Sequence, residues 1–185
     1  MSKREDIITA ALDIISEQGI SALTLPVLFK RAHTGAGTFY HYFDDRSVLI
    51  NGVFERCFNI INEDLIPVVN NPCASHQWFD DAIKALFDAF LLHPREMNFL
   101  YSFAYAHVMP ERDFCLVIPS VALLTRIISQ AQTEGEASTD ASPIVLSRMV
   151  RAMLASMCLC YERGEYDFTE ADAKRFADRA WAAIQ

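Results

Sequence analysis

The apolar and polar residues along this chain follow the period of an α-helix almost throughout. In the first segment the apolar positions recur three or four residues apart, at Ile7, Ile8, Ala11, Leu12 and Ile15. This spacing places them on one face of a helix. Ser2 with Glu5 predicts a capping box at its start, and Gly19 predicts its end. No stretch of useful length alternates apolar and polar residues, so we expect an all-α fold.

The same reading predicts further helices separated by turn-forming residues. They are expected at about 24–32, 37–43, 45–65, 75–92, 95–107, from 119 to near 135, at 142–163 and from 169 onward. Pro67 and the sequence NNP at 70–72 are expected to break the helix after Leu65, because proline lacks the donor of the helical hydrogen bond. The sequence GEASTDASP at 135–143 is the clearest loop.

The stretch RAHTGAGTFYHYFDDRS, residues 31–47, departs from ordinary core spacing by placing aromatic rings side by side. Two short helices joined by a tight turn at 33–36 would form a helix-turn-helix, whose second helix fits the major groove of DNA. Phe39 and Phe43 share a helix face that suits a core. The outward residues would be Thr38, Tyr40, His41 and Tyr42, which can hydrogen-bond to phosphates or base edges. Periodicity alone equally allows these aromatics to fill a small core.

The sequence TLPVLFKRAHTGAGTFYHYFDDRSVL resembles the DNA-binding signature of the TetR family of bacterial transcriptional regulators. The residues at the positions of the family pattern are Thr24, Ala32, Thr38, Tyr40, His41, Tyr42, Phe43, Arg46 and Leu49. The resemblance covers roughly the first fifty residues. It implies a helix-turn-helix domain at 1–47 and a helical ligand-binding and dimerisation domain at 48–185.

The resemblance also implies roles for single residues of the helix-turn-helix. Phosphate contacts would come from Thr38, Tyr40, Tyr42 and Arg46, and positions near base edges from Ala36, Gly37 and His41. Lys30 and Arg31 are basic and nearby, and each can equally be a solvated surface charge. Two residues depart from the family pattern: His33 replaces the usual turn glycine and is expected at positive φ. Gly35 replaces the usual capping serine.

The net charge of −8 and the pI near 5.0 are unusual for a protein that binds DNA. The charge is unevenly distributed. Residues 1–50 hold five basic and six acidic side chains, a net −1, which leaves −7 for the rest of the chain. Charges beyond about 8–10 Å are screened, so the local field at the contact face decides whether DNA is attracted or repelled. An acidic total therefore does not exclude DNA binding.

The helix at 142–163 is apolar on nearly every side, which predicts burial on more than one face. With the last helix, it could form a four-helix interface in a homodimer, as the family does. The expected interface residues are Met149, Met153, Leu154, Phe176 and Trp181. The alternative is the ordinary core of a monomer. A two-fold dimer would present two recognition helices to a near-palindromic operator.

The middle helices are rich in aromatic residues that could line an apolar pocket. The candidates are Phe87, Phe90, Phe99, Phe103, Tyr105, His107, Met153 and Met157. Plain core packing is the alternative for each. Neutral aromatic surroundings favour a small hydrophobic effector, while His107, Arg126, Arg148 or Arg151 could meet an anionic group.

Together these features predict a DNA-binding regulator in the cytoplasm, most simply a repressor that a small ligand releases from double-stranded operator DNA. The five cysteines form no clear disulfide framework, the N-terminus does not resemble a signal peptide, and no apolar run looks long enough to span a bilayer. We expect no cofactor, metal or membrane partner. The alternatives are a redox sensor using Cys158 or Cys160, a ligand-independent regulator, and a helical enzyme, for which no catalytic motif is present.

Overall fold

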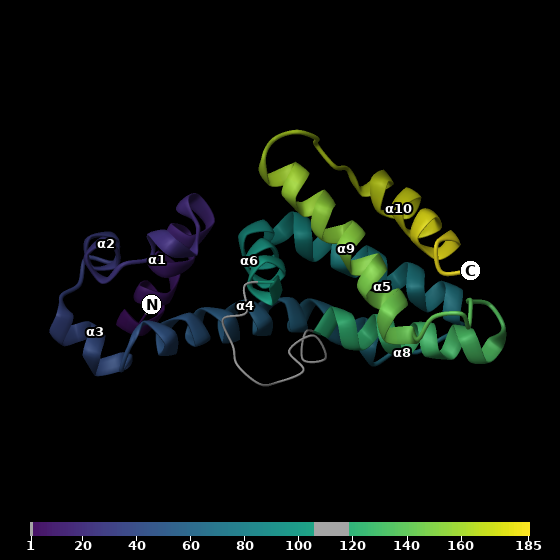
Figure 1. The fold of residues 1–185 in the computed structure, drawn as a ribbon, viewed down its shortest axis with the longest axis horizontal. Coiled ribbons are helices and arrows are strands. Elements are labelled where there is room, and N and C mark those ends of the chain that lie inside the picture. Colours follow the sequence, from purple (N-terminus) through teal and green to yellow (C-terminus); the bar gives the residue numbers. More distant parts are fainter. Residues whose placement is uncertain (1, 106–118) are drawn as a thin grey trace.

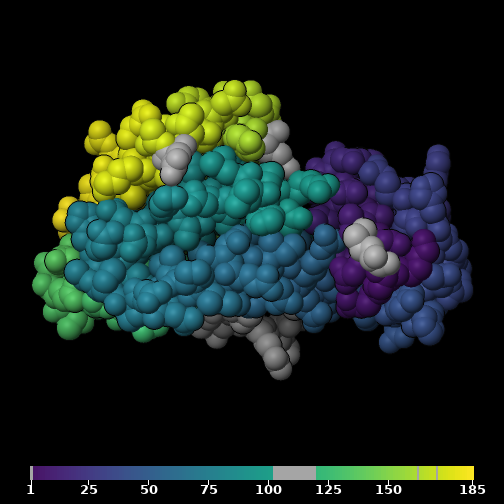
Figure 2. All heavy atoms as spheres, turned by 180° about the vertical axis from the view of Figure 1, so that it is seen from behind, coloured from purple at the N-terminus to yellow at the C-terminus, as the bar shows by residue number. Residues whose placement is uncertain are grey.

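The computed structural model describes residues 2–105 and 119–185, and these residues form helices and connecting loops without any strand. The chain is elongated, with the N-terminal helices gathered at one end and the C-terminus near the other (Figure 1). The space-filling view shows the same division, with residues of the N-terminal region forming a distinct lobe (Figure 2). The all-α expectation is therefore confirmed for the described residues.

The N-terminal lobe contains α1 (Lys3–Gln18), the 3-10 turn η1 (Ile20–Ala22), α2 (Leu25–Arg31) and α3 (Ala36–Tyr42). One of the two hydrogen bonds of the predicted capping box is present at the start of α1, and its predicted end at Gly19 is confirmed. The Glu5 backbone N–H donates to the Ser2 hydroxyl over 3.3 Å, and Gly19 ends the helix at φ +81°. Glycine adopts this left-handed conformation without the steric cost that a Cβ brings.

Helix α4 (Arg46–Val69) is the long element that joins the two ends of the molecule (Figure 1). Asp45 caps it by accepting a 2.9 Å hydrogen bond from the Val48 N–H. Its first turns pack on α1, since Gly52 lies against the side chains of Phe43 and Ile8. The helix thus runs unbroken across residue 47, the predicted domain boundary, and the division at 47 stays a prediction.

The expected end of this helix near Leu65 was wrong, because α4 continues through Pro67 to Val69. Pro67 lies in the last turn, where only a short run of helix follows it. Side chains then satisfy the carbonyls around it: Trp78 Nε1 donates to the Val68 oxygen over 2.9 Å, and Asn71 Nδ2 donates to the Pro67 oxygen over 2.7 Å. These tertiary contacts stabilise an extra turn that local propensity disfavours.

The rest of the described chain packs around α4. Its helices are α5 (Ser75–Leu92), α6 (Pro94–Tyr105), α8 (Pro119–Glu134), α9 (Pro143–Glu162) and α10 (Glu170–Ala182). Helix α5 contacts α4, α8 and α10, while α6 contacts α1, α4 and α9. The buried apolar residues form one continuous core from Ile7 to Ile184, so the two ends of the molecule share an interior.

Helix α9 overturns the expectation that no apolar run is long enough to span a bilayer. Among the described residues, the segment 143–161 passes that test by length and composition, because the two arginines within it do not shorten the apolar window. A core helix passes the same test, and a third of that window is buried. The length of α9 is therefore weak evidence for a membrane, and its exposed apolar side chains need another explanation.

Candidate DNA-binding surface

The helix-turn-helix is formed by α2, a four-residue turn and α3. The recognition helix was predicted at 37–43, and it begins and ends one residue earlier, at Ala36–Tyr42. Gly35 is its extended N-cap and offers no side chain to the free N–H groups, as expected. Phe43 is already extended, at φ −137°, which ends the helix before the aspartates. The shift places Ala36 in the first turn of α3.

The turn between the two helices depends on an unusual conformation at His33. As predicted, this residue has a positive φ, +46°, and it alone among the described non-glycine residues does so. The Thr34 N–H donates to the Phe29 carbonyl over 3.0 Å, the long-range bond that closes a Schellman C-cap. The left-handed conformation costs a non-glycine residue about 1–2 kcal/mol. The turn therefore holds its geometry against a steric cost that glycine would avoid.

The aromatic cluster divides into an inner and an outer set. Phe39 and Phe43 are 0% and 1% exposed, and the Phe39 ring lies 5.7 Å from both Phe29 and Phe43. Tyr40 and Tyr42 are 54% and 38% exposed. The inner rings therefore fill a small core, while the outer rings face solvent, and their contact with DNA stays a prediction. The phenylalanines hold a helix that is too short to be stable alone.

The predicted DNA-contact residues lie together in the N-terminal lobe, and every one of them is exposed. They are Lys30, Arg31, Ala36, Gly37, Thr38, Tyr40, His41, Tyr42 and Arg46. A Cβ on Gly37 would meet no atom within 4 Å, so nothing inside the molecule requires glycine there. The His41 and Tyr42 rings meet edge to face at 4.7 Å. The structure thus presents small and hydrogen-bonding side chains on one exposed helix.

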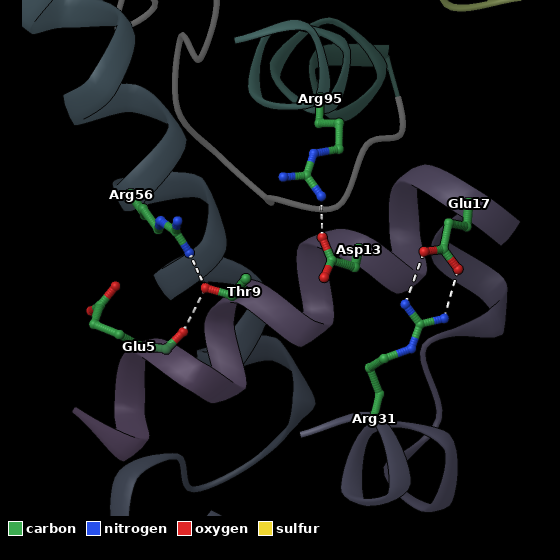
Figure 3. A network of polar contacts seen from close by, with 7 residues as sticks. All are labelled: Glu5, Thr9, Asp13, Glu17, Arg31, Arg56 and Arg95. Atoms are coloured by element: carbon green, nitrogen blue, oxygen red, sulfur yellow. Dashed lines mark hydrogen bonds and ion pairs between the residues drawn. The ribbon is translucent and has the colours of Figure 1, made fainter. Parts of the chain in front are cut away.

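Two of these cations also make contacts within the protein. Arg46 Nη2 donates to the Ile20 carbonyl over 2.6 Å, which links the start of α4 to η1. Arg31 donates to both carboxylate oxygens of Glu17, over 2.8 and 2.6 Å (Figure 3). This ion pair lowers the pKa of Glu17 and raises the pKa of Arg31. Arg31 therefore fastens α2 to α1 in this structure.

The acidic side chains of α1 are matched by basic partners. Lys3 lies 3.6 Å from Asp6 and Arg4 lies 3.4 Å from Glu5, while Glu17 pairs with Arg31 and Asp13 pairs with Arg95. Because each carboxylate of α1 has a cation nearby, the field of this helix is largely neutralised close to the lobe. This pairing gives a physical basis for DNA binding by an acidic chain.

A polar stripe along α1, which sequence reasoning missed, connects the lobe to the rest of the molecule (Figure 3). Its members are four positions apart: Glu5, Thr9, Asp13 and Glu17. Thr9 accepts a 2.5 Å hydrogen bond from Arg56 of α4, and Asp13 pairs with Arg95 of α6. The four-residue spacing was visible in the sequence, but its partners were not, because Arg56 and Arg95 are distant along the chain.

Most of the predicted pocket residues that the structure describes are core residues. Phe87, Phe90 and Phe99 are buried, and the Phe90 ring meets Tyr161 edge to face at 5.2 Å. Met153 and Met157 are half-buried. Phe103 and Tyr105 belong to the last turn of α6, and His107 lies outside the described residues. Surface hollows lined by described residues, such as that between Asp81 and Lys174, contain none of these side chains.

The predicted interface residues fall into two groups. Leu154 and Trp181 are buried within one chain, where the Trp181 ring stacks on His76 at 4.5 Å. Met153 and Phe176 are half-buried, and Met149 is 49% exposed. Sequence reasoning named Met149 but missed the other members of the exposed stripe that α9 presents at a spacing of four, three, four and three residues: Val145, Met149, Ala152, Ser156 and Leu159. We call this set the α9 stripe.

Three of the four described cysteines have a raised pKa. Burial raises the pKa of Cys57 to about 12, and partial desolvation raises the pKa of the exposed Cys73. A hydrogen bond with Glu165 raises the pKa of Cys160. Because the thiolate is the reactive form, these shifts lower the reactivity of each thiol. Within the described residues, no three His, Cys, Asp or Glu side chains gather as a metal site would require.

Comparison with known proteins agrees with this geometry. Residues 7–53 match the family described as bacterial regulatory proteins, tetR family. An uncharacterised HTH-type transcriptional regulator of Bacillus subtilis strain 168, YvdT, is 39% identical over 54 residues. That match covers 29% of this chain, and the chain spans only 28% of the length of that relative.

Solved structures extend the likeness to nearly the whole chain. A TetR family transcription regulator from Marinobacter aquaeolei VT8 has a TM-score of 0.80 at 17% identity, with 98% of this chain and 95% of that one covered. The transcriptional regulator FadR from Bacillus subtilis, in complex with stearoyl-CoA, has a TM-score of 0.73 at 14% identity, with coverage of 98% and 99%. At these identities the likeness concerns the fold. Residues 7–53 thus match the tetR family in sequence, and the chain as a whole shares its fold with solved TetR family regulators.

Proposed function

We propose that this protein is a DNA-binding transcriptional regulator that represses its target until a small molecule releases it from a palindromic operator. The observation that carries the proposal is the two-sided recognition helix. Phe39 and Phe43 anchor α3 from within, while Thr38, Tyr40 and Tyr42 stay exposed on its outer side. Hydroxyl groups held on a rigid element can position the protein on the phosphate backbone.

The proposed contacts follow from exposure and charge. Thr38, Tyr40, Tyr42 and Arg46 would contact phosphates, and Ala36, Gly37 and His41 would lie near base edges. Lys30 is exposed and basic, and it would add to the local positive field. Arg31 would contribute less than Lys30, because its guanidinium is occupied by Glu17.

We further propose that two copies of the chain pair through the α9 stripe. Val145, Met149 and Leu159 are 47%, 49% and 39% exposed along one face of α9, and an exposed row of apolar side chains is typical of a surface that meets a partner. A two-fold dimer would place two recognition helices roughly 34–36 Å apart on one face of the duplex. Pairing of α9 also accounts for its apolar composition without a membrane, and the proposal places the protein in the cytoplasm.

An effector-binding site in the C-terminal region is supported by the fold relative solved with stearoyl-CoA and by the position of α6. Helix α6 packs against α9 on one side and against α1 on the other, where Arg95 pairs with Asp13 (Figure 3). A ligand that moves α6 would therefore act directly on the DNA-binding lobe. Such coupling is reciprocal, so DNA would weaken ligand binding by the same factor.

The decisive experiment is selection of bound sequences from a random pool of duplex DNA. We expect enrichment of a palindrome, since a dimer of recognition helices reads two half-sites. Tyr40→Ala and Arg46→Ala should reduce binding to the selected sequence in gel-shift titrations. A protein that enriches no sequence, or whose affinity is unchanged by both substitutions, would disprove the proposal.

A regulator that senses oxidants is the second candidate, with Cys160 as its half-buried thiol on α9. The raised pKa of Cys160 argues against it. Gel-shift titration before and after mild peroxide treatment separates the two, because a small-molecule sensor should keep its DNA affinity. Loss of affinity that Cys160→Ser prevents would favour the redox alternative.

A further inference from the structure

Arg151 is a buried cation whose hydrogen-bonding needs are not met by the described residues. It lies in the middle of α9 and is only 5% exposed. Its Nε and Nη2 atoms are both inaccessible to solvent, and neither has a hydrogen-bond partner. No described carboxylate pairs with its guanidinium. Arginine is almost never buried unless it is paired, so this side chain requires an explanation.

Among the described residues, an aromatic ring holds the guanidinium in place and no carboxylate neutralises it. Its central carbon lies 4.8 Å from the centre of the Tyr101 ring of α6, which is itself 5% exposed. Ser147, one turn earlier on the same side of α9, is fully buried and already bonded to the Ile144 carbonyl and Thr125. A cation–π contact orients a charge but does not accept hydrogen bonds. An anion is the partner that would satisfy both needs.

The geometry of the two unpartnered nitrogens indicates the kind of anion. Nε and Nη2 form one edge of the planar guanidinium, and their N–H groups point in the same direction. This edge matches the two oxygens of a carboxylate, with two parallel hydrogen bonds. The nearby buried residues of α9 are apolar, namely Val150 and Leu154. A compact carboxylate with an apolar body fits these features.

We propose that Arg151 is the anchor for the carboxylate of the effector, which binds between α6 and α9. This inference rests on the proposed ligand-responsive function and names the chemical class of the ligand: an aliphatic or aromatic carboxylic acid. It also revises the expected neutral hydrophobic effector, because the apolar body would be bound together with a charge. Tyr101 belongs to the same helix as Arg95, so the anchored ligand contacts the helix that holds α1.

The test is calorimetric titration of the DNA-free protein with matched pairs of ligands. The carboxylates are phenylacetate, octanoate and decanoate, and the neutral partners are phenylethanol, octanol and decanol. At least one carboxylate should bind saturably, and its alcohol should bind more weakly by on the order of tenfold or more, since a charge-assisted hydrogen bond is lost. Decanoyl-coenzyme A, whose charges are phosphates, is a separate arm.

Variants complete the test. Arg151→Met should abolish the preference for carboxylate over alcohol while raising Tm, because it removes a buried charge without a partner. Arg151→Lys keeps the charge but not the fork, so it should bind carboxylate with intermediate affinity. Arg163→Met is the matched control, since Arg163 is exposed at the end of the same helix, and it should bind like the unmodified protein.

The inference is overturned if no carboxylate binds, if the alcohols bind as tightly, if decanoyl-coenzyme A alone binds, or if Arg151→Met keeps the preference. Should Arg151→Met fail to fold, Arg151→Lys decides the question alone, because unchanged affinity would exclude the bidentate contact. No DNA is present in these titrations. A protein that binds carboxylate through Arg151 but selects no operator would support this inference while disproving the proposed regulation.

Discussion

Helices α3 and α9 both break the usual rule that apolar side chains lie inside and charged ones outside, but they do so in opposite ways. Helix α3 is seven residues long and exposes the aromatic rings of Tyr40 and Tyr42. Helix α9 is twenty residues long, exposes Met149 and buries Arg151. Tyr40 and Tyr42 are exposed on α3, and Met149 belongs to the α9 stripe. The buried Arg151 contacts Tyr101 of α6. Departures of this kind are expected where a surface or a cavity meets a partner.

The two helices also differ in how strictly their function would constrain the residue type at each position. The family match ends at residue 53, whereas the fold match covers 98% of the chain at 17% identity. A surface that meets the DNA backbone needs hydroxyl and basic groups at fixed positions. A helical core around a variable ligand can be built from many apolar combinations that keep the same volume. The N-terminal region is therefore recognisable by residue identity and the C-terminal region by shape.

The largest effect is expected from removing the inner anchor of α3. Phe39→Ala should lower the free energy of unfolding by about 3–5 kcal/mol, because it leaves a cavity among Phe29, Phe43 and Tyr40. Urea denaturation measures the loss, and gel-shift titration should show that DNA binding is lost with it. Leu92→Ala, at a position 71% exposed, is the control and should change little. An unaltered denaturation midpoint for Phe39→Ala would mean that α3 does not depend on its core side.

The next largest effect concerns the α9 stripe. Met149→Glu should place a charge in the proposed interface and convert the dimer to a monomer, which light scattering detects at micromolar concentration. Operator affinity should then fall by about a hundredfold or more, since the two heads would bind independently. Leu92→Glu introduces the same charge at an exposed apolar position elsewhere. If Met149→Glu, Leu92→Glu and the unmodified protein all have the same oligomeric state by light scattering, the α9 stripe is not the interface.

A smaller effect should distinguish charged from uncharged contacts of α3 and α4. Arg46→Ala should weaken operator binding and reduce the slope of log affinity against log salt by about 0.9, the value for one phosphate contact on duplex DNA. Tyr40→Phe should weaken binding without changing that slope, because only a neutral hydroxyl is lost. Arg163→Ala removes an exposed arginine from the end of α9 and serves as control. A salt slope that does not respond to Arg46→Ala would remove this residue from the contact surface.

The smallest effect is a pH dependence from the Glu17–Arg31 pair. Arg31 lowers the folded-state pKa of Glu17 below its ordinary value of 4.5. The ion pair therefore stabilises the fold above the unfolded-state pKa, and this contribution is lost as the pH falls through the lower, folded-state pKa. Glu17→Gln should make the loss of Tm on acidification smaller than in the unmodified protein. Glu55→Gln, at an exposed position on α4, should leave that loss unchanged. Parallel Tm curves for Glu17→Gln and the unmodified protein would contradict the assignment.

Much of the DNA-binding lobe could be predicted from the sequence because its determinants are local. The capping of α1 by Ser2 and the inward direction of Phe39 and Phe43 follow from neighbouring residues and helical period, whereas the positive φ of His33 was expected from the resemblance to the family pattern. The recognition helix was displaced by one residue, because Gly35 and Phe43 adopt extended conformations that composition alone does not fix. The continuation of α4 past Pro67 was missed, since it depends on Trp78 from another helix.

The sequence by itself determined the helical period, the helix-turn-helix and which side chains of α3 face outward. Only the tertiary structure decided which charges are already occupied: Arg31 by Glu17, Asp13 by Arg95, and Arg151 by no described acidic group. Helical period reports which residues share a face, but not what that face meets. Burial and pairing depend on contacts between segments distant along the chain. Only those contacts reveal that Arg151 is buried and that Met149 is exposed.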